Sequence, residues 1–366
     1  MKIGIIVPAN NRAGPQKLAA LASNDLARHG HQISLFVPRL PYFYYMITLK
    51  RDTIGWLKVI RHHIASYFKN PRFSYHDVIV SEYLNTSIYM HNVLRRPSKD
   101  QLRRLDYLLV MTIAQVDEMK SLYSHERTIY YLLHPEEIAY GYEKAIQEVR
   151  SSFKGKIVAL SPWTARRVSD HIPEPPVVPA VISPTIWANR RTAESKKRDK
   201  DILFHYDTGG NKGSELGSAL IKKICEIRPK TRVSIWHRNS LPDNQHSKVA
   251  CGFIPEKKLI DMYLSHKMFL YPSAWEGFGM PPVEGIACGC IPVLYPGVGA
   301  ADLYARDGET AILIQDDIEL TAKRVAVLLN DAEELSRLQK TATIAVEAFN
   351  PSNYGIKLFR TAGVDC

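Results

Sequence analysis

The sequence is poor in the features that mark specialised classes of protein. It has five cysteines among 366 residues, and because none pair at Cys-x-x-Cys spacing we expect reduced, cytoplasmic thiols and no disulfide framework. The longest apolar run, Leu40 to Leu49, covers about half of the ~20 residues that span a membrane. The first run, Ile3 to Val7, is followed by no cleavage site, so we expect no targeting segment.

Acidic residues are also few compared with basic ones. There are 37 Asp and Glu against 48 Lys and Arg, a net charge of +11 that favours anionic partners such as nucleic acid, acidic lipid or phosphorylated small molecules. The chain has no RRM, KH or helix-turn-helix signature, so we expect no nucleic-acid partner. Internal repeats and low-complexity tracts are absent too, and the apolar share of 45% is that of a globular protein.

The order of apolar runs indicates an α/β fold of two doubly wound parallel sheets. Runs rich in Ile, Val, Leu and Tyr alternate with amphipathic stretches, as expected for strands buried on both faces. In the first half we expect strands Lys2–Pro8, Gln32–Val37, Asp77–Ser81, Tyr107–Thr112, Thr128–Leu133 and Lys156–Leu160, and helices Gln16–Arg28 and Glu136–Val149. In the second half we expect strands Ile202–Tyr206, Arg232–Trp236, Lys267–Tyr271, Ile291–Leu294 and Thr310–Ile314, and helix from Ile318 to Ala348.

A proline-rich connector separates the two halves. The segment from Pro173 to Pro184 holds too many prolines for a helix interior, and it is typical of a semi-rigid linker or hinge. We therefore expect domains of residues 1–180 and 181–350, with the break at Asn350-Pro351 releasing a tail, residues 351–366. Ligands of such sheets bind at the carboxyl ends of the strands, so candidate site residues should follow strands.

The densest cluster of such residues runs from Tyr271 to Gly289. A strand ends near Pro272, a loop with two glycines follows, and a helix begins near Pro281. Gly277 and Gly279 allow close approach of a ligand to backbone N–H groups at a positive helix end. Glu276 on the loop and Glu284 on the helix suit hydrogen bonds to vicinal hydroxyls. The alternative is a tight turn between strand and helix with two solvated glutamates.

Two further strand ends carry candidate residues. Lys212 lies in a glycine-rich loop after strand Ile202–Tyr206, which is a plausible anion cradle; alone, it is as readily a surface lysine beside a turn. His134 ends strand Thr128–Leu133, where it can polarise a hydroxyl or hold a structural hydrogen bond.

This cluster strongly resembles retaining glycosyltransferases of the GT-B fold, family 4. The resemblance rests on Pro-Ser-x-x-Glu-Gly-Phe-Gly-Met-x-x-x-Glu-Gly-x-Ala-Cys-Gly-x-x-Pro-Val, residues 272–293. It continues at residues 298–300 and 307–314, and upstream at Gly252-Phe253-Ile254-Pro255. The first half matches at its strand ends. The resemblance implies two facing Rossmann-like domains with a cleft between them, an acceptor-binding N-terminal domain, a donor-binding C-terminal domain, and a tail that packs back on the first.

The resemblance also implies roles for individual residues. Glu284 would hold the ribose of a nucleotide sugar, while Glu276 would lie nearer the transferred sugar. The amides of Gly277, Phe278 and Gly279, with Met280 beside them, would face the sugar hydroxyls. The remaining members of the implied site are Phe253 and Ile254 at the base, Lys212 and Gly213 at the diphosphate, His134 beside the donor sugar, and Gly14 near phosphate and acceptor.

This sequence departs from the family's pattern at the diphosphate. The family has an arginine five or six residues before the lysine, where this chain has Tyr206 and Asp207, so we consider Arg238 as a substitute cation. We expect a donor site that uses no metal and no cofactor other than the nucleotide sugar.

The stretch from Leu40 to Tyr75 matches no family motif, and it mixes Lys and Arg with Trp, Tyr and Phe. Such a composition is typical of segments that bind anionic membranes, so we expect either a lid for a lipid-linked acceptor at the inner face of the membrane or an ordinary helix pair. The implied function is a hexosyltransferase in polysaccharide biosynthesis that moves sugar from a nucleotide donor, UDP-glucose for example, to a glycan or lipid-linked saccharide. The alternatives are a non-catalytic GT-B subunit that binds nucleotide or glycan, and another GT-B enzyme such as a sugar-nucleotide epimerase.

Overall fold

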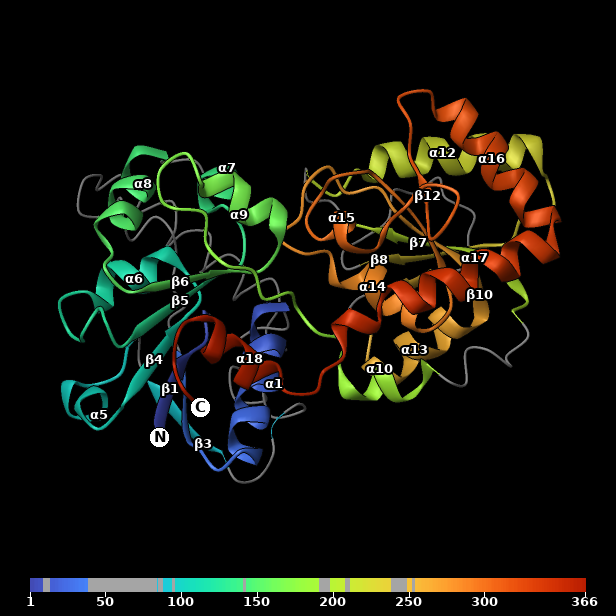
Figure 1. Ribbon diagram of the computed structural model, residues 1–366. Helices are drawn as coiled ribbons and strands as arrows, with labels where there is room; N and C mark the ends of the chain where they lie inside the picture. The colour runs from blue at the N-terminus through green and yellow to red at the C-terminus, as the bar shows by residue number, and fades with distance from the viewer. Residues whose placement is uncertain are drawn as a thin grey trace. The chain divides into compact units, whose positions relative to one another are not determined.

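The computed structural model divides the chain into two compact units (Figure 1). Unit 1 comprises Met1–Pro179 and Ser352–Cys366, and unit 2 comprises Ala180–Pro351. The structure describes residues 1–8, 14–38, 84, 88–93, 96–140, 143–190, 198–207, 211–237, 249–251 and 254–366. Each unit is described by itself below.

Unit 1 is built on a six-stranded parallel sheet of order β3-β2-β1-β4-β5-β6. This is the order of a doubly wound dinucleotide-binding sheet. Its central strands are almost entirely apolar and buried, which is why they tolerate a layer of helices on each face. The strands are β1 (Lys2–Ile6), β2 (Gln32–Pro38), β3 (Tyr89–Val93), β4 (Tyr107–Val110), β5 (Thr128–Leu132) and β6 (Lys156–Ala159).

Buried side-chain caps fix the helices of unit 1 at the carboxyl edge of the sheet. Gln115 donates to the carbonyls of Ile6 and Val7, which joins the first turn of a helix to the end of β1. Glu136 accepts from the amide of Ile113 at 2.8 Å, which joins the same helix to the segment after β5. The helices are α1 (Gly14–Arg28), α5 (Lys99–Arg103), α6 (Ile113–Met119), α7 (Glu136–Tyr140), α8 (Glu143–Ser152), α9 (Pro162–Val168) and α18 (Tyr354–Thr361).

The last helix of the chain, α18, packs against the first, α1, within unit 1 (Figure 1). The buried carboxylate of Asp25 on α1 accepts from the amides of Gly355 and Ile356 at 2.9 and 3.2 Å, so it satisfies two of the orphan donors of the first turn of α18. The hydroxyl of Tyr354 donates to that of Tyr131 on β5 at 3.1 Å. The tail from Ser352 is therefore structurally part of unit 1.

Unit 2 repeats the same topology with a second six-stranded parallel sheet of order β12-β11-β10-β7-β8-β9. Counted from β7, the chain builds one side of this sheet and then the other, so the strand order reverses between β7 and β10. The strands are β7 (Lys200–Tyr206), β8 (Val233–His237), β9 (Val249–Cys251), β10 (His266–Tyr271), β11 (Ile291–Leu294) and β12 (Ile312–Leu313).

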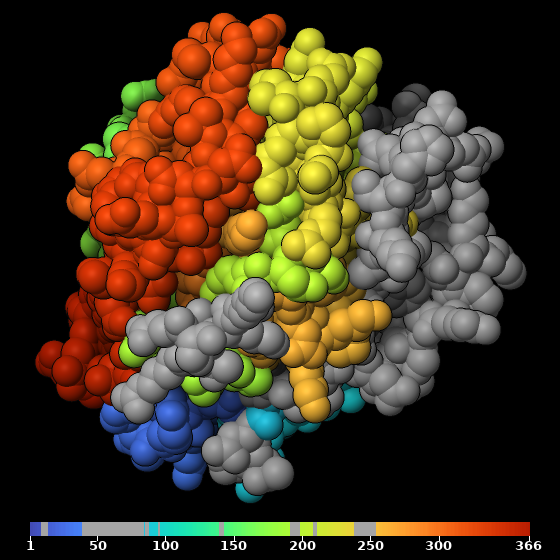
Figure 2. Space-filling view, turned by 90° about the vertical axis from the view of Figure 1, so that its right-hand side faces the viewer, coloured from blue at the N-terminus to red at the C-terminus, as the bar shows by residue number. Residues whose placement is uncertain are grey.

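Helices cover both faces of the unit 2 sheet. Figure 2 shows α12, in yellow, beside the orange C-terminal helices on one face of the unit, and α12 packs against α16. The helices are α10 (Pro184–Ala188), α12 (Ser214–Ile227), α13 (Glu256–Ser265), α14 (Met280–Ala287), α15 (Ala301–Tyr304), α16 (Ile318–Asn330), α17 (Ala332–Ala345) and the 3₁₀ turn η1 (Glu347–Phe349).

The structure corrects several expected elements. The helix expected from Ile318 to Ala348 is broken at Asp331, whose carboxylate caps the next helix by accepting from Glu334 N. The stretch expected as one helix, Glu136–Val149, is two helices, α7 and α8. Strands β3 and β9 were not expected. The expected strand Asp77–Ser81 lies outside the described residues.

Two observations concern disulfide bonds and membrane-spanning helices. Cys225, Cys288, Cys290 and Cys366 are free thiols. Among the residues placed by the structure, no helix is both long and apolar enough to cross a membrane.

Candidate active site

The loops that follow β7 and β10 meet where the strand order of unit 2 reverses. The amide of Ala274 donates to Asn211 O at 2.8 Å, and the side chain of Asn211 donates to Trp275 O at 3.1 Å. Gly213, at φ 63°, leaves so little space that a Cβ would lie 2.0 Å from Pro272 O. Two loops about sixty residues apart in the sequence are thereby locked together by short backbone contacts.

The locked loops bring Lys212 and Glu276 into direct contact. Lys212 Nζ lies 2.6 Å from Glu276 Oε1, and the two side chains are 22% and 16% exposed. Tyr271, the last residue of β10, donates its hydroxyl to the same carboxylate oxygen at 2.8 Å. The strand-end positions of Lys212 and Glu276 were expected from the sequence, whereas Tyr271 was missed, although its place at the end of β10 within the same motif was a usable signal.

The glycine loop after Glu276 forms the start of α14. Gly279 adopts φ 85° as the N-cap of that helix and has no side-chain cap, so the first amides of α14 are not satisfied by a capping side chain. A third loop closes on this one: Ala300 N donates to Phe278 O at 2.9 Å, and a Cβ on Gly299 would lie 2.7 Å from the same oxygen. The Phe278 ring itself is buried and packs edge-on against Phe349.

Glu284 and Met280 lie on α14. Met280 is its first residue, and Glu284 is only 5% exposed. Burial and the charge of Glu284 raise the pKa of Tyr263 well above its usual range. Burial and the charge of Glu276 likewise raise the pKa of Tyr304. The hydroxyls of Tyr263 and Tyr304 are therefore held in the neutral form.

Asp207 stands at one of the positions where the family has an arginine, and its backbone forms two hydrogen bonds with the side chain of Ser214. Asp207 N donates to Ser214 Oγ at 2.9 Å, and that hydroxyl donates back to Asp207 O at 2.6 Å. These bonds fix the distance between the end of β7 and the start of α12. Lys212 lies at the same edge of unit 2 and contributes a cation there.

The remaining expected site residues fall in three groups. Ile254 is buried just before α13. His134 follows β5, and Gly14 is the first residue of α1, both in unit 1. Phe253 and Arg238 lie outside the described residues.

Sequence reasoning missed the cap that holds the segment after His134. Tyr130 donates its hydroxyl to Glu136 at 2.6–2.7 Å, and Arg150 donates to the same carboxylate at 3.2 Å. These residues are fully or almost fully buried. No spacing in the sequence pairs them, so only the fold reveals the contact.

Within the ranges that the structure covers, no three His, Cys, Asp or Glu side chains gather into a group that could hold a metal ion.

Comparison with known proteins finds a family model that matches part of the second half of the chain and several curated relatives that match part of the chain. Residues 243–344 match the model of glycosyl transferases group 1. The chain is 33% identical over 99 residues to the lipopolysaccharide core biosynthesis mannosyltransferase LpsB of Rhizobium meliloti (strain 1021), a match that covers 24% of this chain and 28% of that protein. It is 40% identical over 82 residues to O-antigen chain mannosyltransferase B of Escherichia coli, covering 22% and 20%. The matched regions thus span less than a third of these relatives' own length.

Solved structures extend the likeness to the whole chain. HepE of Anabaena in complex with UDP and glucose superposes with a TM-score of 0.68 at 13% identity, covering 99% of each chain. TarM superposes with a TM-score of 0.71 at 9% identity, covering 99% of this chain and 98% of its own. At these identities the likeness establishes the fold, two Rossmann-like parallel-sheet units of GT-B type.

Proposed function

We propose that this chain, which matches the model of glycosyl transferases group 1 at residues 243–344 and has the GT-B fold, transfers a sugar from a nucleotide donor to a saccharide acceptor. Unit 2 binds the donor and unit 1 binds the acceptor. The observation that carries the proposal is the contact between Lys212 and Glu276 at the point of strand reversal in unit 2.

The chemistry of transfer explains why such a contact is useful. Breaking a sugar–phosphate bond leaves negative charge on the departing nucleoside diphosphate and positive charge on the anomeric carbon. Lys212 supplies a cation for the diphosphate, and the amides at the start of α14 supply oriented donors, by the same electrostatic logic as an oxyanion hole. Glu276 holds Lys212 in place and is itself placed by Tyr271. We propose that no metal takes part and that configuration at the anomeric carbon is retained.

The same geometry supports separate roles for the two glutamates. Glu284 is buried within α14, while Glu276 lies on the loop before it and is partly exposed. We assign Glu284 to the ribose hydroxyls and Glu276 to the transferred sugar. UDP is our preferred nucleotide, because HepE and a trehalose-6-phosphate protein of E. coli, with the same fold, were solved with UDP or a UDP-sugar.

The acceptor that we propose is a growing glycan or a lipid-linked saccharide. Partial relatives include a lipopolysaccharide core enzyme and an O-antigen chain enzyme, both mannosyltransferases. Mannose is therefore a second candidate for the transferred sugar beside glucose.

A thermal-shift titration tests the donor site. We expect UDP, GDP or ADP, or one of their sugars, to raise the melting temperature in EDTA, because a ligand of the folded state stabilises by mass action. Glu284→Gln should abolish the shift, whereas Glu333→Gln, an exposed glutamate in the first turn of α17, should preserve it. A protein that responds to no nucleotide, with or without added magnesium, contradicts the proposal.

Turnover separates the enzyme from the non-catalytic alternative. Release of free nucleotide from the stabilising sugar nucleotide, measured in EDTA, is expected of a metal-independent transferase. Binding without any release, even with acceptor saccharides present, would favour the non-catalytic subunit, and release that depends on a divalent ion would overturn metal independence.

A further inference from the structure

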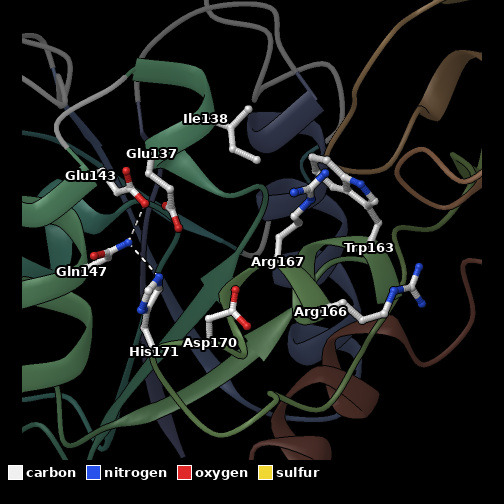
Figure 3. Close-up of a pocket in the computed structure, with 9 residues that line it drawn as sticks. All are labelled: Glu137, Ile138, Glu143, Gln147, Trp163, Arg166, Arg167, Asp170 and His171. Carbon is white, nitrogen blue, oxygen red and sulfur yellow. Dashed lines mark hydrogen bonds between the residues drawn. The ribbon is translucent and has the colours of Figure 1, made fainter.

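Unit 1 contains a pocket of about 500 Å³ between α7, α8 and α9, which the donor chemistry does not use. Its size lies within the range of small-molecule sites. Figure 3 shows its side chains arranged around a common space. The pocket is lined by Glu137, Ile138, Glu143, Gln147, Trp163, Arg166, Arg167, Asp170 and His171.

One wall of the pocket is held rigidly. Arg150, with no exposed surface, donates from both terminal nitrogens to the two oxygens of Glu137, at 2.8 and 2.7 Å. Burial disfavours the charged form of Glu137, but the hydrogen bonds and charge of Arg150 outweigh it and lower the pKa of this carboxyl. The wall therefore remains ionised and fixed in place before any ligand arrives.

A second wall is a chain of planar polar groups. The amide nitrogen of Gln147 lies 3.0 Å from Glu143 Oε1 and 2.7 Å from His171 Nε2. Because both contacts use the amide nitrogen, the amide oxygen of Gln147 and the second oxygen of Glu143 are left as acceptors. With the Gln147 amide donating, His171 Nε2 is the acceptor of this contact.

The opposite side combines an aromatic ring with a cation. The guanidinium of Arg167 stacks over the ring of Trp163 at 5.6 Å from its centroid. Ile138 is 41% exposed and adds an apolar edge (Figure 3). Such a stack restricts the guanidinium while leaving its N–H groups able to donate.

Asp170 completes the set of polar groups. Asp170 lines the pocket together with Glu137 and Arg167 (Figure 3). Within the described part of the chain, this exposed carboxylate has no hydrogen bond or ion pair. It is thus a strong acceptor, and no hydrogen bond to a described residue has to be broken before it binds a ligand.

We propose that this pocket binds a saccharide unit. A sugar ring needs acceptors and donors for its hydroxyls at close range and an apolar edge for its C–H face, and the pocket supplies all three. Three carboxylates disfavour a phosphate or other strong anion, and the two arginines disfavour a simple cation. Saccharide binding in the pocket does not depend on the proposed donor chemistry. Only the inference that the bound saccharide is part of the acceptor rests on the proposed function.

Ligand-observed NMR and calorimetry test the site on the full chain. The probes are maltose, α-1,3-mannobiose and N,N′-diacetylchitobiose, each titrated without nucleotide. We expect at least one disaccharide to receive saturation from the protein, and Asp170→Ala to weaken its binding about tenfold, the ratio expected for one hydrogen bond to a charged group. Asp365→Ala removes an exposed aspartate elsewhere in unit 1 and should leave binding unchanged.

The nucleotide shift, measured on the same samples, separates the two proposals. An Asp170→Ala protein that keeps its melting temperature and its nucleotide response but loses the disaccharide supports the pocket. Absence of binding by all three disaccharides, or binding equal in Asp170→Ala and wild type, overturns it whatever the nucleotide result.

Discussion

At the scale of single residues, the active-site candidate depends on one cation held by one carboxylate. Lys212 and Glu276 are both partly exposed, so solvent screens their attraction and the pair alone adds little stability. The pair instead fixes the positions of the two side chains, because Tyr271 and Lys212 both donate to the same oxygen of Glu276. A donor diphosphate would compete with that carboxylate for the lysine.

Replacing the lysine tests its role directly. We expect Lys212→Met to lower the rate of nucleotide release, compared at the same donor concentration, by about a hundredfold. This is the usual cost of losing one group that stabilises charge in the transition state. Steady-state kinetics measure it. Lys222→Met, on α12 in the same unit and away from the loops at its start, is the matched control, and equal rates in both variants would remove Lys212 from the mechanism.

A buried histidine gives unit 2 a pH-dependent stability. Burial lowers the pKa of His266 to about 4, although its hydrogen bond to Met262 O, at 2.6 Å, acts in the other direction. In the unfolded chain this histidine binds a proton near pH 6.5, whereas in the folded chain it does so only near pH 4. The contribution of His266 to the free energy of unfolding is therefore fully present above pH 6.5 and is lost as the pH falls from 6.5 toward 4.

The predicted loss from this one residue is on the order of 3 kcal/mol across that window. We expect His266→Asn to flatten the dependence of unfolding free energy on pH between about 7 and 4.5, measured by urea denaturation. His29→Asn, at a more exposed site in unit 1, should keep the wild-type slope. A slope unchanged by His266→Asn would show that another group causes it.

Sequence reasoning placed Lys212 and Glu276 each after a strand of a parallel sheet, and the structure has both at such positions. Their contact was not predicted. Glu136 and Arg150 could not be paired from the sequence, because a buried ion pair leaves no periodic or composition signal. The function proposed for Glu284, His134 and the other expected site residues stays a prediction.

At the scale of elements, the loops after β7 and β10 owe their contact to a glycine. Gly213 has φ 63°, and Pro272 O occupies the space that its Cβ would need. Side chains are therefore excluded there both by backbone conformation and by the neighbouring loop.

Gly213→Ala separates these two costs when compared with Gly30→Ala. Gly30 has φ 84°, and no atom lies within 4 Å of the place that a Cβ would take, so its substitution costs about 1–2 kcal/mol of conformational strain alone. We expect Gly213→Ala to cost at least ~2 kcal/mol more and to weaken nucleotide binding. Urea unfolding and thermal shift measure both effects, and equal stabilities would mean that the loops separate without penalty.

Elements were predictable where their residues are buried on both faces. Central strands such as β1 and β10 contain continuous apolar runs, at residues 3–6 and 268–271. Strand β3 is mostly exposed, with the sequence Tyr-Met-His-Asn-Val, and β9 has three residues. Edge strands of this kind lack the periodicity on which prediction depends. The helix break at Asp331 was missed, although Asp331 stands between the two helices and aspartate is strongly preferred as an N-cap.

At the scale of the whole molecule, both sheets are parallel and doubly wound, and the chain passes from unit 1 to unit 2 and back. The return segment contributes Tyr354, Ile356, Leu358 and Phe359 to the buried interior of unit 1. Each buried side chain of this size contributes about 1.5–3 kcal/mol, so their sum is comparable to the stability of a whole domain.

Deleting residues 352–366 should therefore unfold unit 1 and leave unit 2 folded. Hydrogen exchange is the measurement: amides of β1 and β5 should lose protection, while those of β7 and β10 keep it. Asp25→Asn, which weakens the bonds to Gly355 and Ile356, should give a milder loss in unit 1 of about 1–2 kcal/mol. Protected β1 amides in the deleted protein would contradict the prediction.

The return of α18 to α1 also sets the order of events during synthesis. Ribosomes add roughly 5–20 residues per second, so helix α1 emerges many seconds before its partner, with all of Ala180–Pro351 made in between. During that interval the carboxylate of Asp25 and the apolar face of α1 have no α18 to cover them. Unit 2 is thus able to finish folding first, and the nascent first unit is the natural client for a chaperone.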